Sequence, residues 1–382
     1  GAWYTPLAVA IALLAWWASG DATRFLATLV IATPCPLLIA IPIAVIGAIS
    51  LAAKRSIIVR DPASLEQIED CRTMILDKTG TLTYGRAALT DEIYAEGFGS
   101  KLVLAYAASL ERYSKHPLAE PIEKAARNAG LELFESTDIS EKPGEGMRGQ
   151  VDGHLIEITG RRNLEKSGRV DMHLLPPVTF GLECVALVDG QYAATFRFHD
   201  APRVGTKSFI QHLSPTHRFE KIMIVSGDRK VEVDYLAKQI GITEIYAEKS
   251  PEEKVRIVRE LTKASKTLFI GDGINDAPAM VTATVGVAFG KTNDVTISAA
   301  QAVIMDSTLQ KIDEFLHISK RFKSIALQSA LGGMALSMIG MGIAAFGYLP
   351  PVAGAIGQEI IDLLAVMNAL RVSFFPGKLT DF

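Results

Sequence analysis

The sequence has few cysteines and almost no net charge, and each shortage argues against a class of protein. Only three cysteines occur among 382 residues, and no two of them form a Cys-x-x-Cys pair. This spacing argues against a disulfide framework and against a zinc finger. Lysine and arginine number 39 against 42 aspartates and glutamates, a formal net charge of −3. Without a basic excess we expect no nucleic acid among the partners.

Long apolar runs are abundant, and they lie at both ends of the chain. The first is shorter than the roughly 20 residues that a full membrane span requires. The second is free of charge until Lys54. At ~1.5 Å per residue it is longer than the ~30 Å hydrocarbon core, so it should tilt, kink or project from the bilayer. The four runs cover Pro6–Ser19, Phe25–Ala53, Ile325–Phe346 and Val352–Val372.

Basic residues lie on one side of both pairs of apolar runs. Lys54 and Arg55 follow the first pair, and Lys320 and Arg321 precede the second, whereas the turns within the pairs have Arg24 as their only basic residue. The positive-inside rule then places residues 54–323 in the cytoplasm of what we expect to be a bacterial plasma membrane protein. Buried helices of a soluble protein are the alternative, which four such runs with consistent flanking charge disfavour.

Four short apolar segments in the middle of the chain end at polar or glycine residues. They cover 74–76, 222–225, 268–270 and 285–289, and helical patterns lie between them at 231–240 and 252–263. This alternation predicts a doubly wound parallel sheet. Asp77, Asp228 and Asp272 follow strand ends, where such sheets place their sites, so we expect these acids to converge.

Residues 87–195 interrupt this alternation. They contain two helical runs, at 102–109 and 121–129, and then glycine-punctuated alternating segments at 147–151, 154–159 and 185–188. We interpret this segment as an inserted α+β domain, after which the sheet domain resumes near Phe196.

The most informative motif is Asp77-Lys78-Thr79-Gly80-Thr81-Leu82-Thr83, which directly follows a buried apolar segment. It brings a carboxylate nucleophile, a cation and several hydroxyls to one point, as a phosphoryl acceptor requires. The run resembles the phosphorylation signature of P-type ATPases. The whole chain resembles the second part of such a pump, in its soft-metal branch, from the third core membrane helix to the sixth.

Further motifs support this resemblance. Gly271-Asp272-Gly273-Ile274-Asn275-Asp276-Ala277-Pro278 is similar to the second phosphorylation-site signature of the family. Ser226-Gly227-Asp228 resembles its Thr-Gly-Asp motif, with serine in place of threonine, and Lys254 matches the lysine that pairs with the phosphoryl group.

The inserted domain carries three motifs similar to those that bind nucleotide in the metal branch. Ser114-Lys115-His116-Pro117 resembles its His-Pro motif, and Gly144-Glu145-Gly146 resembles its Gly-x-Gly, where bare backbone lets a ligand approach closely. Glu111 lies five residues before His116, the spacing of an adenine contact in that branch. The resemblance therefore implies that ATP is bound by Glu111, His116, Pro117, Gly144 and Gly146.

The resemblance also implies a mechanism. Asp77 attacks the γ-phosphorus of ATP and becomes an aspartyl phosphate. Mg²⁺ is expected on Asp77, Asp272 and the backbone carbonyl of Thr79. Other residues neutralise the phosphate oxygens, donate hydrogen bonds to them, or support the loop that holds Mg²⁺. These residues are Lys78, Ser226, Gly227, Asp228, Lys254, Asn275 and Asp276.

A soluble phosphatase of the same nucleophile superfamily is the main alternative enzyme. Such enzymes place a second aspartate two residues after the nucleophile, where this sequence has Thr79. A threonine cannot act as that acid and base, so the phosphoenzyme should be long-lived, as a pump requires.

The candidate cargo site lies in the apolar runs. Thr33-Pro34-Cys35-Pro36 contains two prolines that remove backbone donors, so the helix should open in mid-membrane with Cys35 at the break. Glu359 and Asp362 share a helix face in the fourth run, and acids inside a membrane helix indicate an ion site. We expect these three side chains to bind the transported metal. A thiolate with carboxylates suits Zn²⁺, Ni²⁺, Co²⁺ or Fe²⁺ better than Cu⁺.

No Thr-Gly-Glu occurs in the sequence, and the resemblance places that motif on the actuator domain that drives dephosphorylation. We therefore expect a fragment, or one half of a split protein, that phosphorylates at Asp77 without sustained turnover. Its partners would be ATP, a transition-metal ion, the bilayer, and a missing N-terminal half or a metallochaperone. A truncated regulatory remnant is the non-enzyme alternative.

The expected fold is a multi-domain membrane protein that exports a transition metal. It combines a bundle of four transmembrane helices with a cytoplasmic haloacid-dehalogenase-like α/β phosphorylation domain, into which an α+β nucleotide-binding domain is inserted. The expected boundaries are membrane helices at 1–20, 21–53, 321–346 and 350–374, phosphorylation-domain parts at 54–86 and 196–320, and the nucleotide-binding domain at 87–195.

Overall fold

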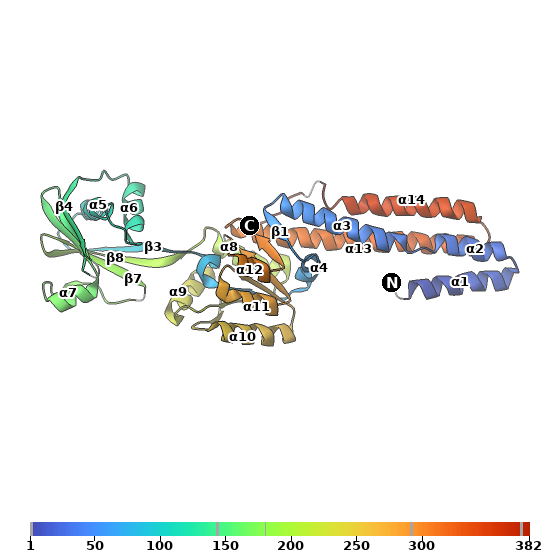
Figure 1. Cartoon of the computed structure of the whole chain (residues 1–382), viewed down its shortest axis with the longest axis horizontal. Helices are drawn as coiled ribbons and strands as arrows, with labels where there is room; N and C mark the ends of the chain where they lie inside the picture. Colours follow the sequence, from blue (N-terminus) through green and yellow to red (C-terminus); the bar gives the residue numbers. More distant parts are fainter. Residues whose placement is uncertain (1–2, 143–144, 180, 291–292, 375–376) are drawn as a thin grey trace. The chain divides into compact units, whose positions relative to one another are not determined.

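The computed structural model describes the whole chain except residues 1–2, 143–144, 180, 291–292 and 375–376 (Figure 1). It divides into two compact units. The first unit comprises residues 1–77, 205–227 and 239–382, and the second comprises residues 78–204 and 228–238. The first unit therefore contains both ends of the described chain. The chain passes from the first unit into the second and back twice.

The first unit contains a seven-stranded sheet. Its central strands are buried along their whole length, because parallel strands covered on both faces need apolar side chains at every position. All neighbours pair in parallel except β1 with β13. The predicted doubly wound parallel sheet is therefore confirmed. The strand order is β1 (Ile57–Val59), β13 (Ala302–Ile304), β12 (Val285–Phe289), β11 (Thr267–Gly271), β2 (Thr73–Leu76), β9 (Lys221–Val225) and β10 (Glu244–Tyr246).

Short helices connect these strands. One of them, α10, begins with a complete capping box: the Ser250 hydroxyl accepts from the Glu253 amide, and the Glu253 carboxylate accepts from the Ser250 amide. Pro251 occupies the first helical turn, where its missing N–H costs nothing. The connecting helices are α4 (Ala63–Gln67), α8 (Thr206–His217), α9 (Lys230–Ile240), α10 (Pro251–Ala264), α11 (Ala277–Thr282) and α12 (Asp294–Ala299).

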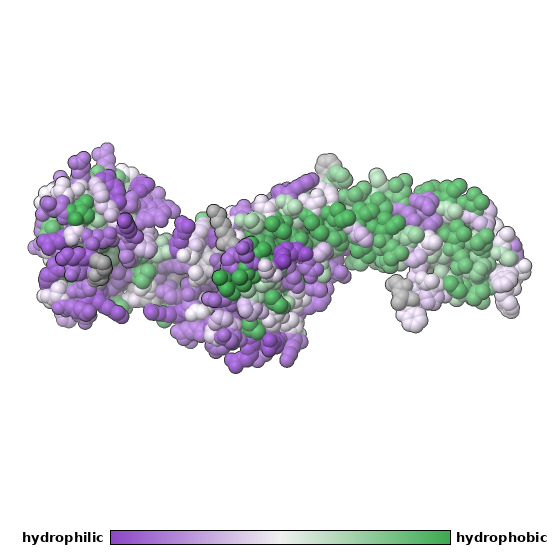
Figure 2. Space-filling model, viewed as in Figure 1, coloured by the Kyte–Doolittle hydropathy of each residue, from purple (hydrophilic) through white to green (hydrophobic). Residues whose placement is uncertain are grey.

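The same unit contains five apolar helices at the two ends of the chain. By length and composition three of the described segments can cross a membrane: residues 22–53, 309–345 and 351–370. Hydrophobic residues make up much of the visible face of these helices, interrupted by paler and by hydrophilic residues (Figure 2). The helices are α1 (Tyr4–Ser19), α2 (Ala22–Ile31), α3 (Cys35–Ala53), α13 (Leu309–Ala345) and α14 (Pro351–Leu370).

Helix α13 begins earlier than the third apolar run. It has 37 residues, so at ~1.5 Å per residue it is longer than the ~30 Å hydrocarbon core. Its first turns carry buried polar residues, Asp313 and Glu314, and contact α4 and α8. One continuous helix thus joins the sheet region of the first unit to its apolar helices.

The second unit is built on a six-stranded antiparallel sheet. Helices α5 (Ser100–Glu111) and α6 (Ala119–Asn128) pack together, and α5 contacts β5 and β6. The core between them includes Leu110, Phe196 and Phe198. This is the α+β arrangement predicted for the insertion. The strand order is β3 (Thr83–Tyr94), β8 (Gln191–Pro202), β7 (Leu182–Val188), β6 (His154–Thr159), β5 (Gly146–Val151) and β4 (Ser136–Lys142), and α7 (Arg161–Ser167) precedes β7.

Candidate active site

Asp77 lies at the carboxyl end of β2, between the neighbouring strands β11 and β9. Its amide donates to the carbonyl of Ile270 at 2.9 Å, which continues the β2–β11 pairing to the first residue after the strand. The residue is only 6% exposed. The parallel sheet therefore holds this carboxylate in a fixed position at its carboxyl edge, where doubly wound sheets place their sites.

A buried lysine lies between two carboxylates at this edge. The Nζ atom of Lys254 donates to Asp77 Oδ1 at 2.6 Å and to Asp276 Oδ1 at 2.7 Å. Lys254 belongs to the first turn of α10, which the capping box holds in place. Although burial disfavours its charge, the two carboxylates raise the pKa of Lys254 above its ordinary value, so its ammonium remains charged.

Three carboxylates gather around this lysine. One oxygen each of Asp77, Asp272 and Asp276 lies within 4.8 Å of the others. Burial raises the pKa of Asp77 to about 7, Asp276 and Asp272 add to the rise, and Lys254 opposes it. One ammonium does not balance three carboxylates, and an oxygen donor set with excess negative charge is what Mg²⁺ prefers. The cluster therefore fits a hard divalent cation.

Glycine at position 271 allows this arrangement. A Cβ atom on Gly271 would lie 2.7 Å from Asp276 Oδ2, closer than any real contact. The amide of Gly273 also faces this oxygen, at 3.4 Å. From the sequence, Asp276 was expected only to support the loop, and Gly271 had no expected role. The glycines on both sides of Asp272 were the available signal, because Gly271 leaves room for Asp276 at the strand end.

The residues after Asp77 form a tight loop in the second unit. The Nζ atom of Lys78 donates to Asp228 Oδ2 at 2.9 Å, and Thr79 Oγ1 donates to the same oxygen at 2.6 Å. Gly80 adopts φ = 79°, a left-handed conformation that glycine tolerates best. Asp228 thus fixes the cation and the hydroxyl that follow the candidate nucleophile.

Three other predicted residues of this region lie in the loops that follow β9 and β11. Ser226 is buried at the end of β9, where its amide donates to Tyr246 O at 2.9 Å and its carbonyl accepts from Lys249 N at 3.0 Å. A Cβ atom on Gly227 would lie 3.3 Å from the Lys249 carbonyl. Asn275 is exposed in a short 3₁₀ turn.

The second unit brings some of the predicted nucleotide residues to the end of α5. Glu111 is the last residue of that helix and is buried, which raises its pKa to about 7. Its Oε2 atom has no hydrogen-bond partner among the residues that the structure describes. His116 and Pro117 are exposed in the following turn. Gly146 has φ = 99°, and a Cβ atom there would lie 2.2 Å from Ile158 O, so only glycine fits. Gly144 lies outside the described residues.

A second cluster lies where the apolar helices are interrupted. Helix α2 ends at Ile31 and α3 begins at Cys35, so the prolines open the helix as predicted. The Gln358 amide reaches the Thr33 carbonyl at 3.5 Å and donates to Asp362 Oδ1 at 2.8 Å. Cys35, which is half-buried, is within hydrogen-bonding reach of Asp362.

This cluster differs from the predicted one in three side chains. Glu359 is exposed on α14, although it lies one turn from Asp362. Gln358 is buried, and its Oε1 accepts from the Ser337 hydroxyl at 3.0 Å. Sequence reasoning gave neither Gln358 nor Ser337 a role, because neutral polar side chains in an apolar run carry little signal alone.

Comparisons with known proteins identify the family of this chain. Residues 71–284, more than half of the chain, match the family of haloacid dehalogenase-like hydrolases. The chain belongs to that family. Residues 71–284 include Asp77, Lys254, Asp272 and Asp276, so the whole carboxylate–lysine cluster lies within the part of this haloacid dehalogenase-like protein that matches.

Over nearly its whole length, this haloacid dehalogenase-like protein is similar to metal-transporting ATPases. It is 33% identical to copper-transporting ATPase 1 of Rhizobium meliloti (strain 1021), with 97% of this chain and 48% of the relative covered. It is also 33% identical to the cadmium, zinc and cobalt-transporting ATPase of Bacillus subtilis (strain 168), with 98% and 55% covered. The chain spans about half the length of the curated relatives it matches.

A solved structure extends the likeness to the fold. A crystal structure of a zinc-transporting PIB-type ATPase superposes with a TM-score of 0.82 at 26% identity, covering 97% of this chain and 62% of that one. The predicted resemblance to heavy-metal P-type ATPases is therefore confirmed, as are the predicted fold class and the membrane location. These relatives do not support a soluble phosphatase.

Proposed function

We propose that this chain supplies the phosphorylated, nucleotide-binding and cargo-binding parts of an ATP-driven transition-metal exporter. The observation that carries the proposal is the buried contact between Lys254 and Asp77 within a carboxylate cluster at the end of a parallel sheet. The same chain carries apolar helices long enough to cross a membrane. A phosphoryl acceptor and a broken membrane helix in one chain are the two ends of a coupled transport reaction.

In the proposed reaction a carboxylate oxygen of Asp77 attacks the γ-phosphorus of ATP. A new P–O bond forms, the bond to the bridging oxygen breaks, and ADP leaves with that oxygen and its electron pair. Lys254 would offset negative charge on the transferred group, and Thr79 and Ser226 would donate hydrogen bonds to its oxygens. The residues proposed to hold Mg²⁺ are Asp77, Asp272 and the Thr79 carbonyl, and bound Mg²⁺ neutralises phosphate charge. Asp276 faces the same cluster.

The aspartyl phosphate is proposed to be long-lived. The position two residues after Asp77 carries Thr79, whose hydroxyl donates to Asp228. A threonine cannot activate water as a carboxylate would. The phosphoenzyme is therefore proposed to hydrolyse slowly, so that a conformational step can move the cargo before the phosphate is lost.

ATP is proposed to bind within residues 87–195. The unpartnered Oε2 atom of Glu111 supports this assignment, because a buried acceptor without a donor is costly and the adenine amino group is a suitable donor. The exposed ring of His116, with Pro117 beside it, and the bare backbone at Gly146 and Gly144 complete the proposed site.

The cargo is proposed to be a borderline divalent ion, Ni²⁺, Co²⁺, Fe²⁺ or Zn²⁺, in preference to Cu⁺. The proximity of Cys35 and Asp362 supports this, because a thiolate with carboxylate oxygens is a poor match for Cu⁺. Glu359, one helical turn away, is the third proposed ligand. A metallochaperone is the proposed source of the cargo. A separate N-terminal half is the proposed source of the other domains of the transporter.

Labelling with γ-³²P-ATP tests the proposed acceptor. The chain should acquire an acid-stable label that hydroxylamine removes, since acyl phosphates react with hydroxylamine. The Asp77→Asn variant should carry no label, whereas Asp91→Asn, at an exposed aspartate on β3, should be labelled normally. A label that persists in Asp77→Asn would refute the assignment.

A metal panel tests the proposed cargo separately. In the full-length transporter, Ni²⁺, Co²⁺, Fe²⁺ or Zn²⁺ should stimulate ATP hydrolysis more than Cu⁺. Cys35→Ser should remove that stimulation and leave labelling of Asp77 by ATP intact. Stronger stimulation by Cu⁺ would overturn the preference but not the phosphorylation site.

A further inference from the structure

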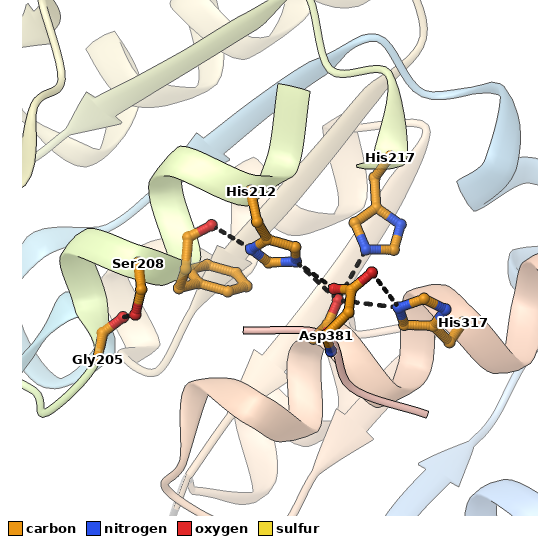
Figure 3. A network of polar contacts seen from close by, with 8 residues as sticks. Gly205, Ser208, His212, His217, His317 and Asp381 are labelled. Atoms are coloured by element: carbon orange, nitrogen blue, oxygen red, sulfur yellow. Dashed lines mark hydrogen bonds and ion pairs between the residues drawn. The ribbon is translucent and has the colours of Figure 1, made fainter. Parts of the chain in front are cut away.

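Three of the seven histidines of this chain meet at a point that the proposed transport cycle does not use (Figure 3). His212 and His217 lie on α8, and His317 lies near the start of α13. Two aspartates join them: Asp313, also on α13, and Asp381, in the segment that follows α14. Side chains from three distant parts of the sequence therefore converge.

The imidazoles point at one carboxylate oxygen rather than at separate acceptors. The Nε2 atoms of His212, His217 and His317 lie 2.9, 2.7 and 3.6 Å from Asp313 Oδ1. Asp313 itself is fully buried. Three ring nitrogens around one carboxylate oxygen bring several candidate metal ligands within a few ångströms of one another.

Asp381 closes the cluster from the other side. Its carboxylate lies 3.6 Å from His212 Nε2 and 3.4 Å from His317 Nε2, and its amide donates to Asp313 Oδ2 at 3.2 Å. One ligand atom each of His212, His217, Asp313 and Asp381 lies within 4.8 Å of the others. Ligands of a tetrahedral zinc ion are about 3.3 Å apart, given bonds of about 2.0–2.1 Å, so a small contraction suffices.

Two further details favour an ion over a purely structural network. The Nε2 atom of His317 is buried and has no hydrogen-bond partner within the described part of the chain, although it faces both carboxylates. His212 uses its other nitrogen, Nδ1, to contact the Phe209 carbonyl at 2.6 Å. Histidine ligands are usually oriented in this way, by a carbonyl that accepts from the nitrogen opposite the metal.

Two aromatic rings lie against His212. The ring of Phe382 stacks on it with a centroid separation of 4.7 Å, and the centroid of the Phe209 ring lies 5.5 Å from that of His212. These rings hold the imidazole in place, which favours binding of a cation to it.

We propose that His212, His217, His317 and Asp381, with Asp313, form a binding site for a divalent transition-metal ion of borderline softness, such as Zn²⁺ or Co²⁺. Imidazole and carboxylate ligands suit these ions, whereas Mg²⁺ prefers oxygen ligands alone. The imidazoles of His212 and His217 and the carboxylates of Asp313 and Asp381 complete a tetrahedron, with His317 beside them, and the two aspartates balance the charge of the ion. This ion would link α8, the start of α13 and the segment around Asp381. The site is separate from both Asp77 and Cys35.

Binding of Co²⁺ to the purified full chain tests this proposal. The experiment uses a Cys35→Ser background, which removes the candidate cargo ligand, and excess Mg²⁺, which occupies the all-oxygen cluster at Asp77. Equilibrium dialysis should then find one Co²⁺ per chain, and the visible absorption of that ion should indicate nitrogen and oxygen ligands in a tetrahedral field.

Variants then locate the ion. His217→Gln should weaken Co²⁺ binding at least tenfold, while His173→Gln, at an exposed histidine, should leave it unchanged. His217 is buried, so its loss could impair folding. Asp381→Asn provides a second variant, because its side chain is 38% exposed, and it should also weaken binding about tenfold. Absence of bound Co²⁺ in the Cys35→Ser background, or unchanged affinity in Asp381→Asn, would overturn the proposal.

Discussion

Two clusters in the first unit surround buried carboxylates with different partners. Around Asp77 three carboxylates lie close together, and one lysine contacts two of them. Around Asp313, three imidazoles face two carboxylates. The first cluster is rich in oxygen and carries excess negative charge, so it suits a hard cation and a phosphoryl group. The second is rich in nitrogen, so it suits a borderline metal. The neighbours of a buried carboxylate, more than the carboxylate itself, therefore decide its chemistry.

The largest effect is expected from removing the lysine of the first cluster. Lys254→Ala leaves Asp77 and Asp276 without their shared cation, so phosphorylation of Asp77 should slow by roughly 10²- to 10³-fold. Rapid-quench measurement of the phosphoenzyme checks this. Lys263→Ala, at an exposed lysine of the same helix, is the control. An unchanged rate in Lys254→Ala would mean that the cluster does not depend on its lysine.

The next effect concerns the hub of the second cluster. Asp313→Asn removes a fully buried charge that faces three imidazoles, and breaking such a network should cost about 3 kcal/mol of unfolding free energy. Asp381→Asn, whose side chain is partly exposed, should cost less than about 1 kcal/mol. Thermal unfolding of the two variants in metal-free buffer compares them. Equal losses would show that Asp313 is not the hub.

A third buried carboxylate, that of Glu111, has neither a lysine nor a histidine among the described groups that shift its pKa. Its pKa rises from 4.5 to about 7, so the native state holds a proton that the unfolded chain has lost. Ionising this side chain therefore costs stability as pH rises from about 4.5 to about 7, and the cost stays constant above that range.

Glu111→Gln should remove this dependence. Relative to the unaltered chain, the variant should gain about 2 kcal/mol between pH 5 and pH 8. Unfolding at the two pH values measures the gain, with Glu165→Gln, at an exposed glutamate, as the control. Parallel behaviour of the variant and the unaltered chain would contradict the raised pKa.

The smallest effect tests how the first cluster is held in place. Ser250→Ala removes the hydroxyl that caps α10 immediately before Lys254, and should cost about 1 kcal/mol of stability. Phosphorylation should slow only a few-fold, since Lys254 keeps its partners. Ser100→Ala, at an exposed serine that is not the cap of its helix, is the control for the unfolding measurement.

Much of the first unit could be predicted from sequence, because fully apolar segments that end at acids identify buried parallel strands. The break at Pro34 could also be predicted, since proline removes a backbone donor wherever it lies. In the second unit the segments that form β3, β4 and β8 were not predicted to be strands. Ser136–Lys142 is largely exposed, so it has no alternating apolar pattern to detect.

The histidine cluster could not be predicted for a different reason. His212 and His217 belong to one helix, but Asp313 and Asp381 come from segments that only the folded chain brings together. No short motif links them. Asp276 was placed in the correct loop, but its direct contact with Lys254 depends on how α10 packs against the turn after β11.

Helix α13 fixes the relative rotation of side chains at two distant sites, the histidine cluster and the break between α2 and α3. Asp313 and His317 on its first turns face the histidine cluster, and Ser337 on the same helix donates to Gln358 beside the break between α2 and α3. Adding or deleting one residue between them would rotate one end by about 100° relative to the other. Either the aspartate or the serine would then lose its partner. The length of this stretch is therefore as constrained as its composition, and substitutions should be tolerated there far more readily than insertions or deletions.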